Sequence, residues 1–273
     1  MKVLINCPSK FNLKSKNINS LGGIESLSIC LAKELSKKNI NITLSTICHK
    51  TIIKNTIKNI PISEIKKNSA LYNFDTIISS NDASIFNYFK SAKKIFWQHN
   101  ILQVEKAIRK KQFINIILNN PIAVFVSSYL RNKSSKLFFF KKKIVIPNFL
   151  MLPFVDKKIN YKRQPIFIWS VQRDRGLDKT IKMWVNEIYP FNKSAKFHIY
   201  GIKKLPNKYK DKYLVSKNII FKGRVSKKKL KNIYNKALAM ICLGYDETFC
   251  LNALEANSCG LPVLTFGKTA VKD

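Results

Sequence analysis

The chain has 273 residues, of which 46% are hydrophobic, so it can bury a full core in one large or two modest domains. Its 50 Lys and Arg residues against 15 Asp and Glu give a formal net charge of +35, a balance that suits nucleic acid or an anionic membrane. The lysines are scattered through every segment beside abundant Ile and Asn, which indicates a bias of the whole sequence rather than one designed patch. We therefore expect no nucleic-acid partner, and an anionic membrane surface stays a candidate partner.

Cysteine usage and hydropathy point to the same compartment. The six cysteines show no Cys-x-x-Cys spacing and several lie in apolar runs, as buried reduced thiols of a cytosolic protein do. The first apolar run is too short for a signal peptide, and no stretch reaches the roughly 18 apolar residues of a spanning helix. We expect a cytoplasmic protein, either soluble or peripheral at the inner face of a membrane.

The first half of the chain alternates buried strands with helical segments. Strands are predicted at 3–6, 41–47 and 75–79, a helix follows Gly22 and Gly23 to about Lys38, and helix-compatible segments lie between and after the later strands. Gly22 and Gly23 allow backbone conformations closed to other residues and let a ligand approach closely, or they simply punctuate a loop before the helix. Their spacing is not Gly-x-Gly-x-x-Gly, so it does not predict a nicotinamide dinucleotide site. The alternation predicts a parallel, doubly wound sheet.

One histidine lies where ligands of such sheets gather. The apolar strand that begins at Lys94 ends in Gln98, His99 and Asn100. Ligands of open α/β sheets bind outside the carboxyl ends of the strands, which makes His99 a candidate site residue. A lone histidine is as readily structural, and both interpretations stay open.

The rest of this half leads to a linker. A strand at 121–126 is followed by Ser127 or Ser128 as a helix cap, and 144–148 is a closing strand. Between them, 137–143 interleaves aromatic residues with lysines, which fits either an anionic lipid surface or a helix end with solvated lysines. The Pro- and Lys-rich stretch 149–163 is typical of a linker.

The second half repeats the alternation. Strands are predicted at 165–170, 196–201, 218–224 and 237–243, with a helix at 226–236 that a serine caps, and every carboxyl end should point to one cleft. Arg175 follows the first of these strands, with Arg173 beside it. A guanidinium grips phosphate in a bidentate manner, although either residue could instead form a surface salt bridge.

Two carboxylates near the C-terminus, Glu247 and Glu255, are eight positions apart. If a helix begins near Phe249, Glu255 lies in its second turn and Glu247 in the loop before it, so both can face one cleft. The amides of Phe249, Cys250 and Leu251 would then be unpaired donors that attract phosphate, flanked by acceptors for sugar hydroxyls. The alternative is an ordinary amphipathic helix with solvated acids.

The pattern of Glu247, Glu255 and the stretch 256–263 resembles the donor-site signature of retaining glycosyltransferases of the GT-B fold, in particular glycosyltransferase family 4 (group 1). The resemblance implies that Glu247 contacts the donor sugar and that Glu255 holds ribose hydroxyls. It also implies that the loop at Gly22 and Gly23 lies against donor phosphate or acceptor.

Further roles follow from the same resemblance. Many members carry an arginine at the end of the first strand of the second domain and a lysine before the next glycine, both pairing with the donor diphosphate. This chain has Ser170 and Arg175 at these places, which resembles a subgroup with Arg-Gly-Leu. Arg175 is therefore the candidate for neutralising the leaving group, with Arg173 as its substitute, and His99 is placed near the reaction centre by its similarity to a Trp-x-His-Asn segment of some members.

These implications define the expected protein. Two Rossmann-like, doubly wound domains should face each other across a cleft, an acceptor-side domain at 1–158 and a donor-binding domain at 159–273 that looks truncated. The expected activity is a retaining hexosyltransferase that moves a sugar from a UDP- or GDP-linked donor to a saccharide or lipid-linked glycan, with no cofactor and no metal ion. A catalytically inactive sugar-nucleotide-binding protein is the alternative, and a basic nucleic-acid-binding protein is a weaker one.

Overall fold

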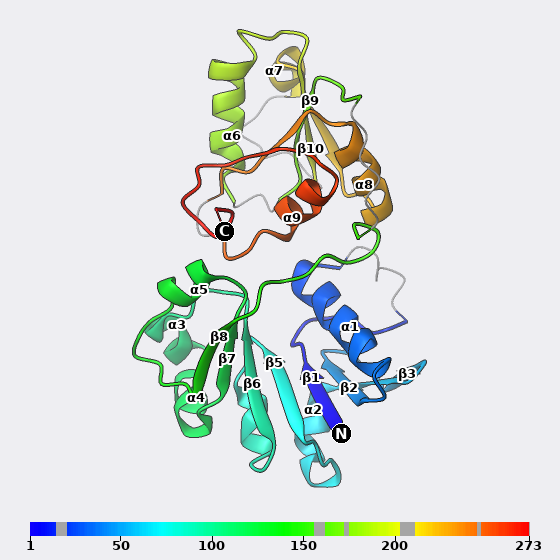
Figure 1. The fold of residues 1–273 in the computed structure, drawn as a ribbon, viewed down its shortest axis with the longest axis vertical. Helices are drawn as coiled ribbons and strands as arrows, with labels where there is room; N and C mark the ends of the chain where they lie inside the picture. The colour runs from blue at the N-terminus through cyan, green and yellow to red at the C-terminus, as the bar shows by residue number, and fades with distance from the viewer. Residues whose placement is uncertain (15–20, 156–161, 172–174, 203–210, 245–246, 273) are drawn as a thin grey trace. The chain divides into compact units, whose positions relative to one another are not determined.

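The computed structural model describes residues 1–14, 21–155, 162–171, 175–202, 211–244 and 247–272. The chain divides into two compact units, Met1–Phe149 and Leu150–Asp273, each built on a mainly parallel β-sheet (Figure 1). The division falls inside the predicted linker, whereas the expected boundary between residues 158 and 159 lies outside the described residues.

The first unit holds an eight-stranded sheet in the order β3-β4-β2-β1-β5-β6-β7-β8. All of its strand pairs are parallel except β3 with β4. Its elements are β1 (Lys2–Asn6), α1 (Gly23–Ser36), β2 (Asn41–Thr46), β3 (Ile52–Lys54), β4 (Ile57–Pro61), α2 (Ile62–Lys67), η2 (Ser69–Leu71), β5 (Thr76–Ser80), η3 (Ser84–Tyr88), β6 (Lys93–Gln98), α3 (Val104–Arg109), α4 (Phe113–Asn119), β7 (Ile122–Phe125), α5 (Ser128–Lys133) and β8 (Lys142–Val145).

Both faces of this sheet are covered, which explains why a strand such as β1 carries apolar residues in succession. Val3 and Ile5 pack in one core cluster with Ile29 of α1, while Leu4 between them packs in another with Ile65 of α2. Successive side chains of a strand point to opposite faces, so the run predicted as a buried strand serves two cores. The predicted doubly wound sheet is confirmed for this unit.

One feature of this unit was not predicted. Helix-compatible segments were expected between β2 and β5, and α2 lies there, but residues 52–61 before it form the antiparallel hairpin β3–β4. Its isoleucines are β-branched and favour strands. Asn55 in the turn adopts a φ of 53°, a left-handed conformation that asparagine tolerates well.

The aromatic and basic segment 137–143 lies in a loop that runs into β8, after α5 has already ended at Lys133. Phe138 and Phe140 belong to the core, with ring centroids 6.2 Å apart, whereas Leu137 and Phe139 are exposed. Exposure alternates along the segment, so Phe138 and Phe140 stabilise the core while Leu137 and Phe139 face solvent. A helix end, one of the two interpretations of this segment, is thereby excluded.

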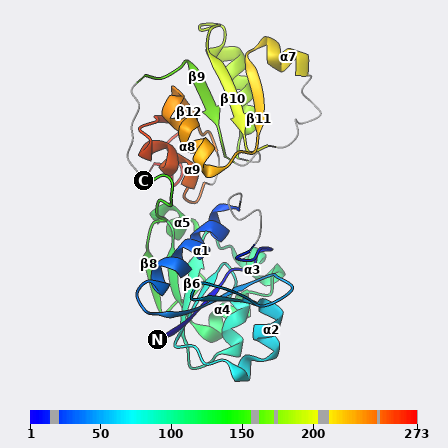
Figure 2. The ribbon, with the colours of Figure 1, turned by 90° about the vertical axis from the view of Figure 1, so that its right-hand side faces the viewer.

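The second unit holds a five-stranded parallel sheet in the order β11-β10-β9-β12-β13, whose first four strands lie side by side in Figure 2. The strands predicted in this half are confirmed to within two residues at most ends. Its elements are β9 (Ile166–Trp169), α6 (Leu177–Met183), the π-helical η4 (Trp184–Ile188), β10 (Lys196–Tyr200), α7 (Asp211–Ser216), β11 (Ile219–Gly223), α8 (Lys227–Lys236), β12 (Ala239–Ile241), α9 (Leu251–Ser258) and β13 (Val263–Leu264).

Large buried side chains fix the base of this sheet. Trp184 stacks on Phe197 with ring centroids 5.1 Å apart, and its indole N–H donates to the carbonyl of Lys217 at 2.8 Å. The Tyr234 hydroxyl of α8 lies 2.8 Å from Ser170 Oγ at the end of β9. Because these polar tips are hydrogen-bonded, the aromatic bodies can be buried without unpaired groups. The hydrogen bond between Tyr234 and Ser170 therefore fixes the carboxyl end of β9.

The predicted serine caps are also present. Ser127 Oγ accepts from the Leu130 amide at 3.0 Å at the start of α5, and Ser226 Oγ accepts from the Lys229 amide at 3.3 Å at the start of α8. Each hydroxyl satisfies one of the unpaired amides of the first turn. The helix starts that follow β7 and β11 were thus readable from the sequence.

Candidate functional site

The winding of the second sheet reverses between β9 and β12. The chain passes from β9 through β10 to β11 on one side and returns to β12 and β13 on the other, with β9 and β12 paired. The loops that follow β9 and β12 therefore leave the sheet next to each other at its carboxyl edge. Open α/β sheets bind their ligands at such a point.

Arg175 and Glu247 lie on these two loops and contact each other. Arg175 Nε is 3.7 Å from Glu247 Oε1, and the two side chains are 26% and 10% exposed. The sequence had singled out both residues separately, 72 positions apart. Arg173, the predicted substitute of Arg175, lies outside the described residues. The structure thus places one cation and one carboxylate, both partly shielded from water, at the edge where a ligand is expected.

Two glycines let these loops approach so closely. Gly176, directly after Arg175, has a φ of +92°, and a Cβ there would stand 2.8 Å from the carbonyl oxygen of Leu243. A Cβ on Gly244 would stand 3.1 Å from the Arg175 carbonyl oxygen and 3.1 Å from Glu247 Cγ. Backbone therefore packs on backbone where the two loops cross, and no larger residue fits at Gly176 without a shift. This packing sets the distance between the cation and the carboxylate.

The helix after Glu247 begins later than the sequence suggested. α9 starts at Leu251 rather than near Phe249, because Cys250 adopts a left-handed conformation, with φ 59° and ψ 71°, and serves as the N-cap. The Cys250 carbonyl accepts from the amides of Ala253 at 3.0 Å and Leu254 at 3.3 Å. Of the three predicted phosphate-binding amides, those of Phe249 and Cys250 therefore precede the helix, and that of Leu251 is its first.

A side chain of α9 also ties the helix to the first strand. The Asn252 amide nitrogen donates to the backbone carbonyl of Ser170, the residue after β9. The start of α9 is thus anchored to the end of β9, one of the two strands between which the sheet reverses. Sequence reasoning missed Asn252, since an asparagine at the start of a helix is ordinarily explained by capping.

Glu255 lies in the second turn of α9, as predicted, but in contact with a residue that the sequence did not single out. Both of its carboxylate oxygens accept from Lys227 Nζ, at 2.6 and 2.7 Å, and the side chain is 1% exposed. Burial raises the pKa of Glu255, and the charge of Lys227 acts in the opposite direction. Lys227 Nζ also lies 5.6 Å from the centre of the Phe154 ring. Lys227 opens α8, and nothing in its local sequence distinguishes it from the lysines that follow.

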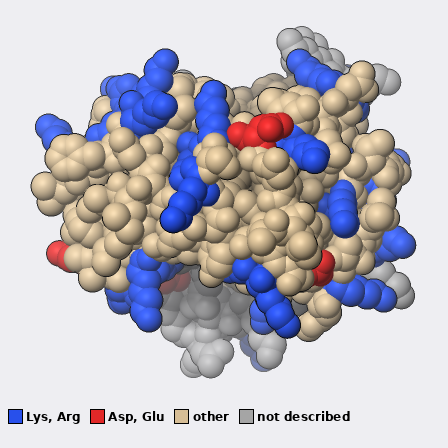
Figure 3. Space-filling model, turned by 90° about the horizontal axis from the view of Figure 1, so that it is seen from below, with Lys and Arg blue, Asp and Glu red and all other residues tan. Residues whose placement is uncertain are grey.

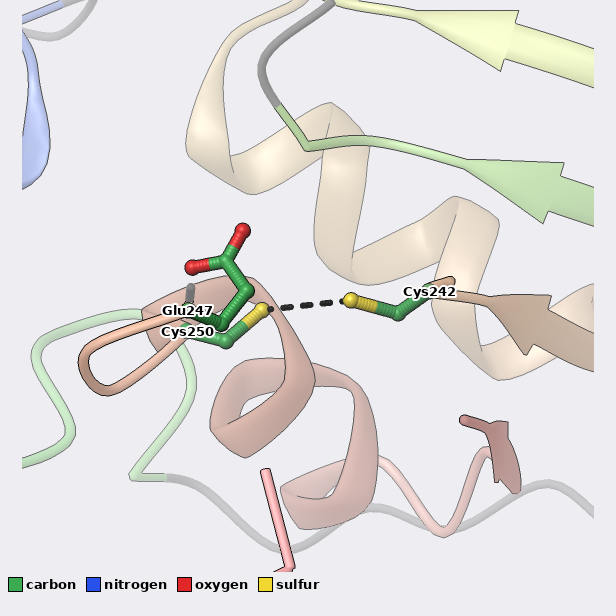
Figure 4. A group of neighbouring side chains, drawn as sticks. All are labelled: Cys242, Glu247 and Cys250. Carbon is green, nitrogen blue, oxygen red and sulfur yellow. Dashed lines mark hydrogen bonds between the residues drawn. The ribbon is translucent and has the colours of Figure 1, made fainter. Parts of the chain in front are cut away.

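Two cysteines flank Glu247. Cys242 follows β12 and Cys250 precedes α9, and their sulfurs are 3.6 Å apart, within hydrogen-bonding distance (Figure 4). One ligand atom from each of Cys242, Glu247 and Cys250 lies within 4.8 Å of the others, and all three residues are buried. The hydrogen bond from Cys250 lowers the pKa of the Cys242 thiol. The sequence predicted no metal site: the two cysteines are eight positions apart, and no Cys-x-x-Cys pattern marks them.

His99 follows β6 in the first unit, at the carboxyl edge of the first sheet, as predicted. Its backbone amide donates to Asn81 Oδ1 at 2.9 Å, and its ring lies against Trp97 with centroids 4.5 Å apart. Burial lowers its pKa to about 4, so the imidazole is neutral at neutral pH. A neutral, fixed imidazole can exchange hydrogen bonds with a hydroxyl but supplies no positive charge.

The predicted glycines mark the start of α1. Gly22 is the N-cap of α1 and Gly23 its first residue. A Cβ on Gly22 would stand 2.5 Å from a carboxylate oxygen of Glu25, which turns back over the start of its own helix. A carboxylate at the positive end of a helix dipole is favourable. The position that the resemblance assigns to phosphate or acceptor is thus next to an acidic side chain.

A polar network at the same edge was missed. Asn6 Nδ2, at the end of β1, donates to Ser79 Oγ at 2.9 Å, and Asp82 Oδ1 accepts from Gln112 Nε2 at 3.0 Å and from the Ser84 amide at 2.9 Å. β1 and β5 are the strands between which the first sheet reverses. The run of Ser, Ser, Asn and Asp at 79–82 after an apolar strand was the available signal.

On the face drawn in Figure 3, basic side chains do not gather in one patch. Figure 3 shows Lys and Arg scattered over the face in view, among residues of other kinds. Among the described residues, no helix is both long and apolar enough to cross a membrane.

The family comparison concerns the second unit. Residues 155–272 match the family model described as "Glycosyl transferases group 1". The match covers Arg175, Glu247 and Glu255, that is, the carboxyl edge of the second sheet. It agrees with the group 1 resemblance of the C-terminal stretch.

Solved structures show the fold of the whole chain. TarM aligns with a TM-score of 0.70 and 12% identity, over 97% of this chain and 84% of that one. WaaG, a glycosyltransferase involved in lipopolysaccharide biosynthesis, gives 0.69 and 12% over 96% and 80%. Sucrose-phosphate synthase of Thermosynechococcus elongatus gives 0.68 and 14% over 97% and 80%. The predicted GT-B fold, with two Rossmann-like parallel-sheet domains, is confirmed.

One curated protein with a similar sequence is a chaperone. The chain is 25% identical to the chaperone SurA of Buchnera aphidicola subsp. Schizaphis graminum, over 75% of this chain, and it spans 55% of the length of that protein. An identity at this level shows neither a common family nor a common activity.

Proposed function

We propose that this chain is a retaining glycosyltransferase of the family 4 type, which transfers a hexose from a UDP- or GDP-linked donor to a saccharide or lipid-linked glycan. The observation that carries the proposal is the contact of Arg175 with Glu247 at the reversal point of the second sheet. The group 1 match over the same residues supports it. A structure of S. aureus TarM in complex with UDP and a glycan, which aligns at a TM-score of 0.57 and 17% identity, belongs to a protein of this fold.

Arg175 and Glu247 divide the donor between them in this proposal. The Arg175 guanidinium pairs with the diphosphate, whose negative charge grows as the bond to the sugar breaks. Glu247 accepts hydrogen bonds from the sugar hydroxyls and orients the ring. The amides of Phe249, Cys250 and Leu251, just before and at the start of α9, add neutral donors for phosphate oxygens. The donor ligand would occupy the space beside the Arg175 and Glu247 contact.

Glu255 and Lys227 form the ribose end of the donor site. A buried carboxylate held by a lysine has remaining acceptor capacity for two vicinal hydroxyls, which suits a ribose. Burial raises the pKa of this carboxyl group, and the charge of the lysine opposes that rise. Without that charge, Glu255 would more often be protonated and would lose acceptor capacity.

Retention follows if the leaving group itself takes the proton. The bond from the anomeric carbon to the phosphate oxygen breaks, the acceptor oxygen bonds to the same carbon on the same face, and the acceptor proton passes to the departing phosphate. Such a step is catalysed by positioning and charge stabilisation rather than by a protein nucleophile. Arg175 stabilises the diphosphate while the diphosphate acts as the base.

The first unit supplies the acceptor side in this proposal. His99 is neutral at neutral pH and can hold an acceptor hydroxyl, as can the amide and hydroxyl groups near Asn6. Gly22 and Gly23 start α1, the helix that follows β1, and in this proposal they belong to the same carboxyl edge of the first sheet. Peripheral binding to an anionic membrane would use Leu137 and Phe139, which are exposed in a segment that also carries lysines.

The test is transfer itself. The full chain is incubated with UDP- and GDP-linked hexoses and a panel of glycan and glycolipid acceptors, and the product is analysed for its anomeric configuration by NMR. Retained configuration in a product that Arg175→Ala fails to form supports the proposal. Donor binding without transfer to any acceptor of the panel would favour the non-catalytic sugar-nucleotide-binding protein instead. Inverted configuration would exclude the proposed mechanism.

A further inference from the structure

The pair of thiols beside Glu247 has the geometry of a metal site. The sulfurs of Cys242 and Cys250 are 3.6 Å apart. Two thiolates bound to one tetrahedral zinc ion, each about 2.3 Å from the metal, have sulfurs about 3.8 Å apart. The backbone on both sides of the loop therefore already holds the two sulfurs at the separation that a shared ion requires.

The carboxylate of Glu247 completes a third position. An oxygen of Glu247 and both sulfurs lie within 4.8 Å of one another, and Figure 4 shows the carboxylate beside the Cys250 sulfur. The exposed fractions are 1% for Cys242 and 8% for each of the other two residues. The group is thus shielded from bulk water, and an ion bound there would exchange slowly. The described part of the chain supplies three ligands, which leaves a tetrahedral ion one position for water or another ligand atom.

The charges in this region suit a divalent cation. Two thiolates and one carboxylate carry three negative charges, a divalent ion carries two positive charges, and Arg175, 3.7 Å from Glu247, carries one more. The sum is zero, so the ion adds no net charge to the buried site. A soft sulfur pair with one oxygen favours zinc-class ions over magnesium or calcium, which prefer oxygen ligands.

We propose that Cys242, Cys250 and Glu247 form a binding site for a thiophilic divalent cation of the zinc class, and that this ion competes with the donor sugar for Glu247. On binding, both thiols lose their protons to solvent and three bonds form to the metal, with no change of oxidation state. The ion then holds the carboxylate that would otherwise orient the sugar. The competition rests on the proposed function, whereas the binding of the ion does not.

Cobalt(II) is the probe for the first part, since thiolate ligation gives it charge-transfer bands and a tetrahedral site gives it strong visible bands. The reduced full chain is titrated with Co²⁺ and then with Zn²⁺ in the absence of any nucleotide sugar. One ion per chain, with both sets of bands and displacement by zinc, is the expected result. Calorimetry in buffers of different ionisation enthalpy should show about two protons released per ion.

The variants separate this site from other thiols. Cys242→Ala should weaken cobalt binding more than a hundredfold, and Glu247→Gln should weaken it less, because both thiolates remain. Cys259→Ala is the matched control, since Cys259 is also buried, at the C-terminal end of α9. Circular dichroism checks that each variant is folded, and Cys242→Ser replaces Cys242→Ala if the latter is not. Unchanged thiolate bands in a folded Cys242 variant, or wild-type protein without these bands, would overturn the site.

The competition between the ion and the donor sugar is tested by measuring the affinity for the donor. Affinity for the UDP- or GDP-linked hexose identified in the transfer screen is measured with saturating Zn²⁺ and with EDTA. We expect binding at least tenfold weaker with zinc for the wild type and little change for Cys242→Ala. Equal affinity in both conditions would refute the competition. If cobalt binds but the chain transfers no sugar, the proposed function fails alone, and if sugar is transferred without cobalt bands, the metal site fails alone.

Discussion

The two sheets end in edges of different chemistry. At the carboxyl edge of the second sheet, Arg175 contacts Glu247 and Lys227 holds a buried Glu255, so opposite charges lie in pairs. At the carboxyl edge of the first sheet, His99 is held neutral by burial and Asn6 and its neighbours form a network of amides and hydroxyls.

This difference matches the two halves of a transfer reaction. A nucleotide diphosphate carries charge that must be balanced, which requires cations close to carboxylates that orient the sugar. An acceptor hydroxyl is neutral and needs hydrogen bonds and position rather than charge. Two Rossmann-like sheets can therefore divide donor and acceptor by the residues at their edges. Each of the following variants alters one edge and leaves the other unchanged.

The largest effect is expected for Glu247→Gln. Loss of the carboxylate next to Arg175 should lower the transfer rate about 10²–10³-fold, because the proposed contact of Glu247 with the donor sugar is removed while the fold stays intact. Steady-state transfer with a saturating donor measures it. The matched control is Glu187→Gln, which removes an exposed carboxylate on η4 of the same unit. Equal losses in both variants would show that the effect is one of general charge.

Lys227→Met tests the ribose end through stability. The variant leaves the carboxylate of Glu255, 1% exposed, without its cation, which should lower the free energy of unfolding by about 3–5 kcal/mol at pH 7. Because the pKa of Glu255 is already raised by burial, protonation relieves the unpaired charge, so the loss should shrink as pH falls. Urea denaturation measures both. The double variant Lys227→Met/Glu255→Gln should recover much of the loss, and a single variant as stable as the wild type would contradict the pairing.

Gly176→Ala probes the crossing of the two loops. A Cβ at Gly176 meets a backbone oxygen at 2.8 Å in a left-handed conformation, so we expect a loss of about 2–3 kcal/mol and a displaced Arg175. Gly223→Ala is the control, since Gly223 also has a positive φ, +67°, but nothing within 4 Å of the added carbon. That variant should lose only about 1 kcal/mol. Similar losses in thermal or urea unfolding would mean that backbone strain alone, and not the close approach, matters at Gly176.

At neutral pH the smallest effect concerns the neutral edge. The pKa of His99 is about 4 in the folded chain and about 6.5 in an unfolded one, so the unfolded state binds more protons between these values. Stability from this group is full above pH 6.5 and is lost as pH falls towards 4. His99→Gln should remove this pH dependence, which amounts to about 3 kcal/mol between pH 7 and 4. An unaltered pH profile would show that His99 is not buried as a neutral imidazole.

The features that could be predicted from the sequence are those that depend on apolar periodicity, on helix caps and on the motif. The buried strands, the serine caps of α5 and α8, and the positions of Arg175 and Glu247 after two strands follow from patterns of apolar residues and from the motif. Contacts between distant segments were not readable in this way. Nothing in the sequence distinguishes Lys227 from the other lysines, and its contact with Glu255 appears only in the fold. The spacing of Cys242 and Cys250 matches no metal-binding pattern, and only the fold brings their sulfurs together. The hairpin at 52–61 was missed because short runs of isoleucine fit strand and helix alike.

Comparison of free nucleotide with nucleotide sugar offers the sharpest test of the division of the donor between Arg175 and Glu247. Calorimetry would give the affinities of the wild type, Arg175→Ala and Glu247→Gln for UDP, GDP and their hexose conjugates, in the presence of EDTA. Arg175→Ala should bind both the free nucleotide and its conjugate more weakly, because the diphosphate is common to them. Glu247→Gln should bind the free nucleotide like the wild type but lose the added affinity that the sugar provides. If both variants bind every ligand as the wild type does, the carboxyl edge of the second sheet is not the donor site.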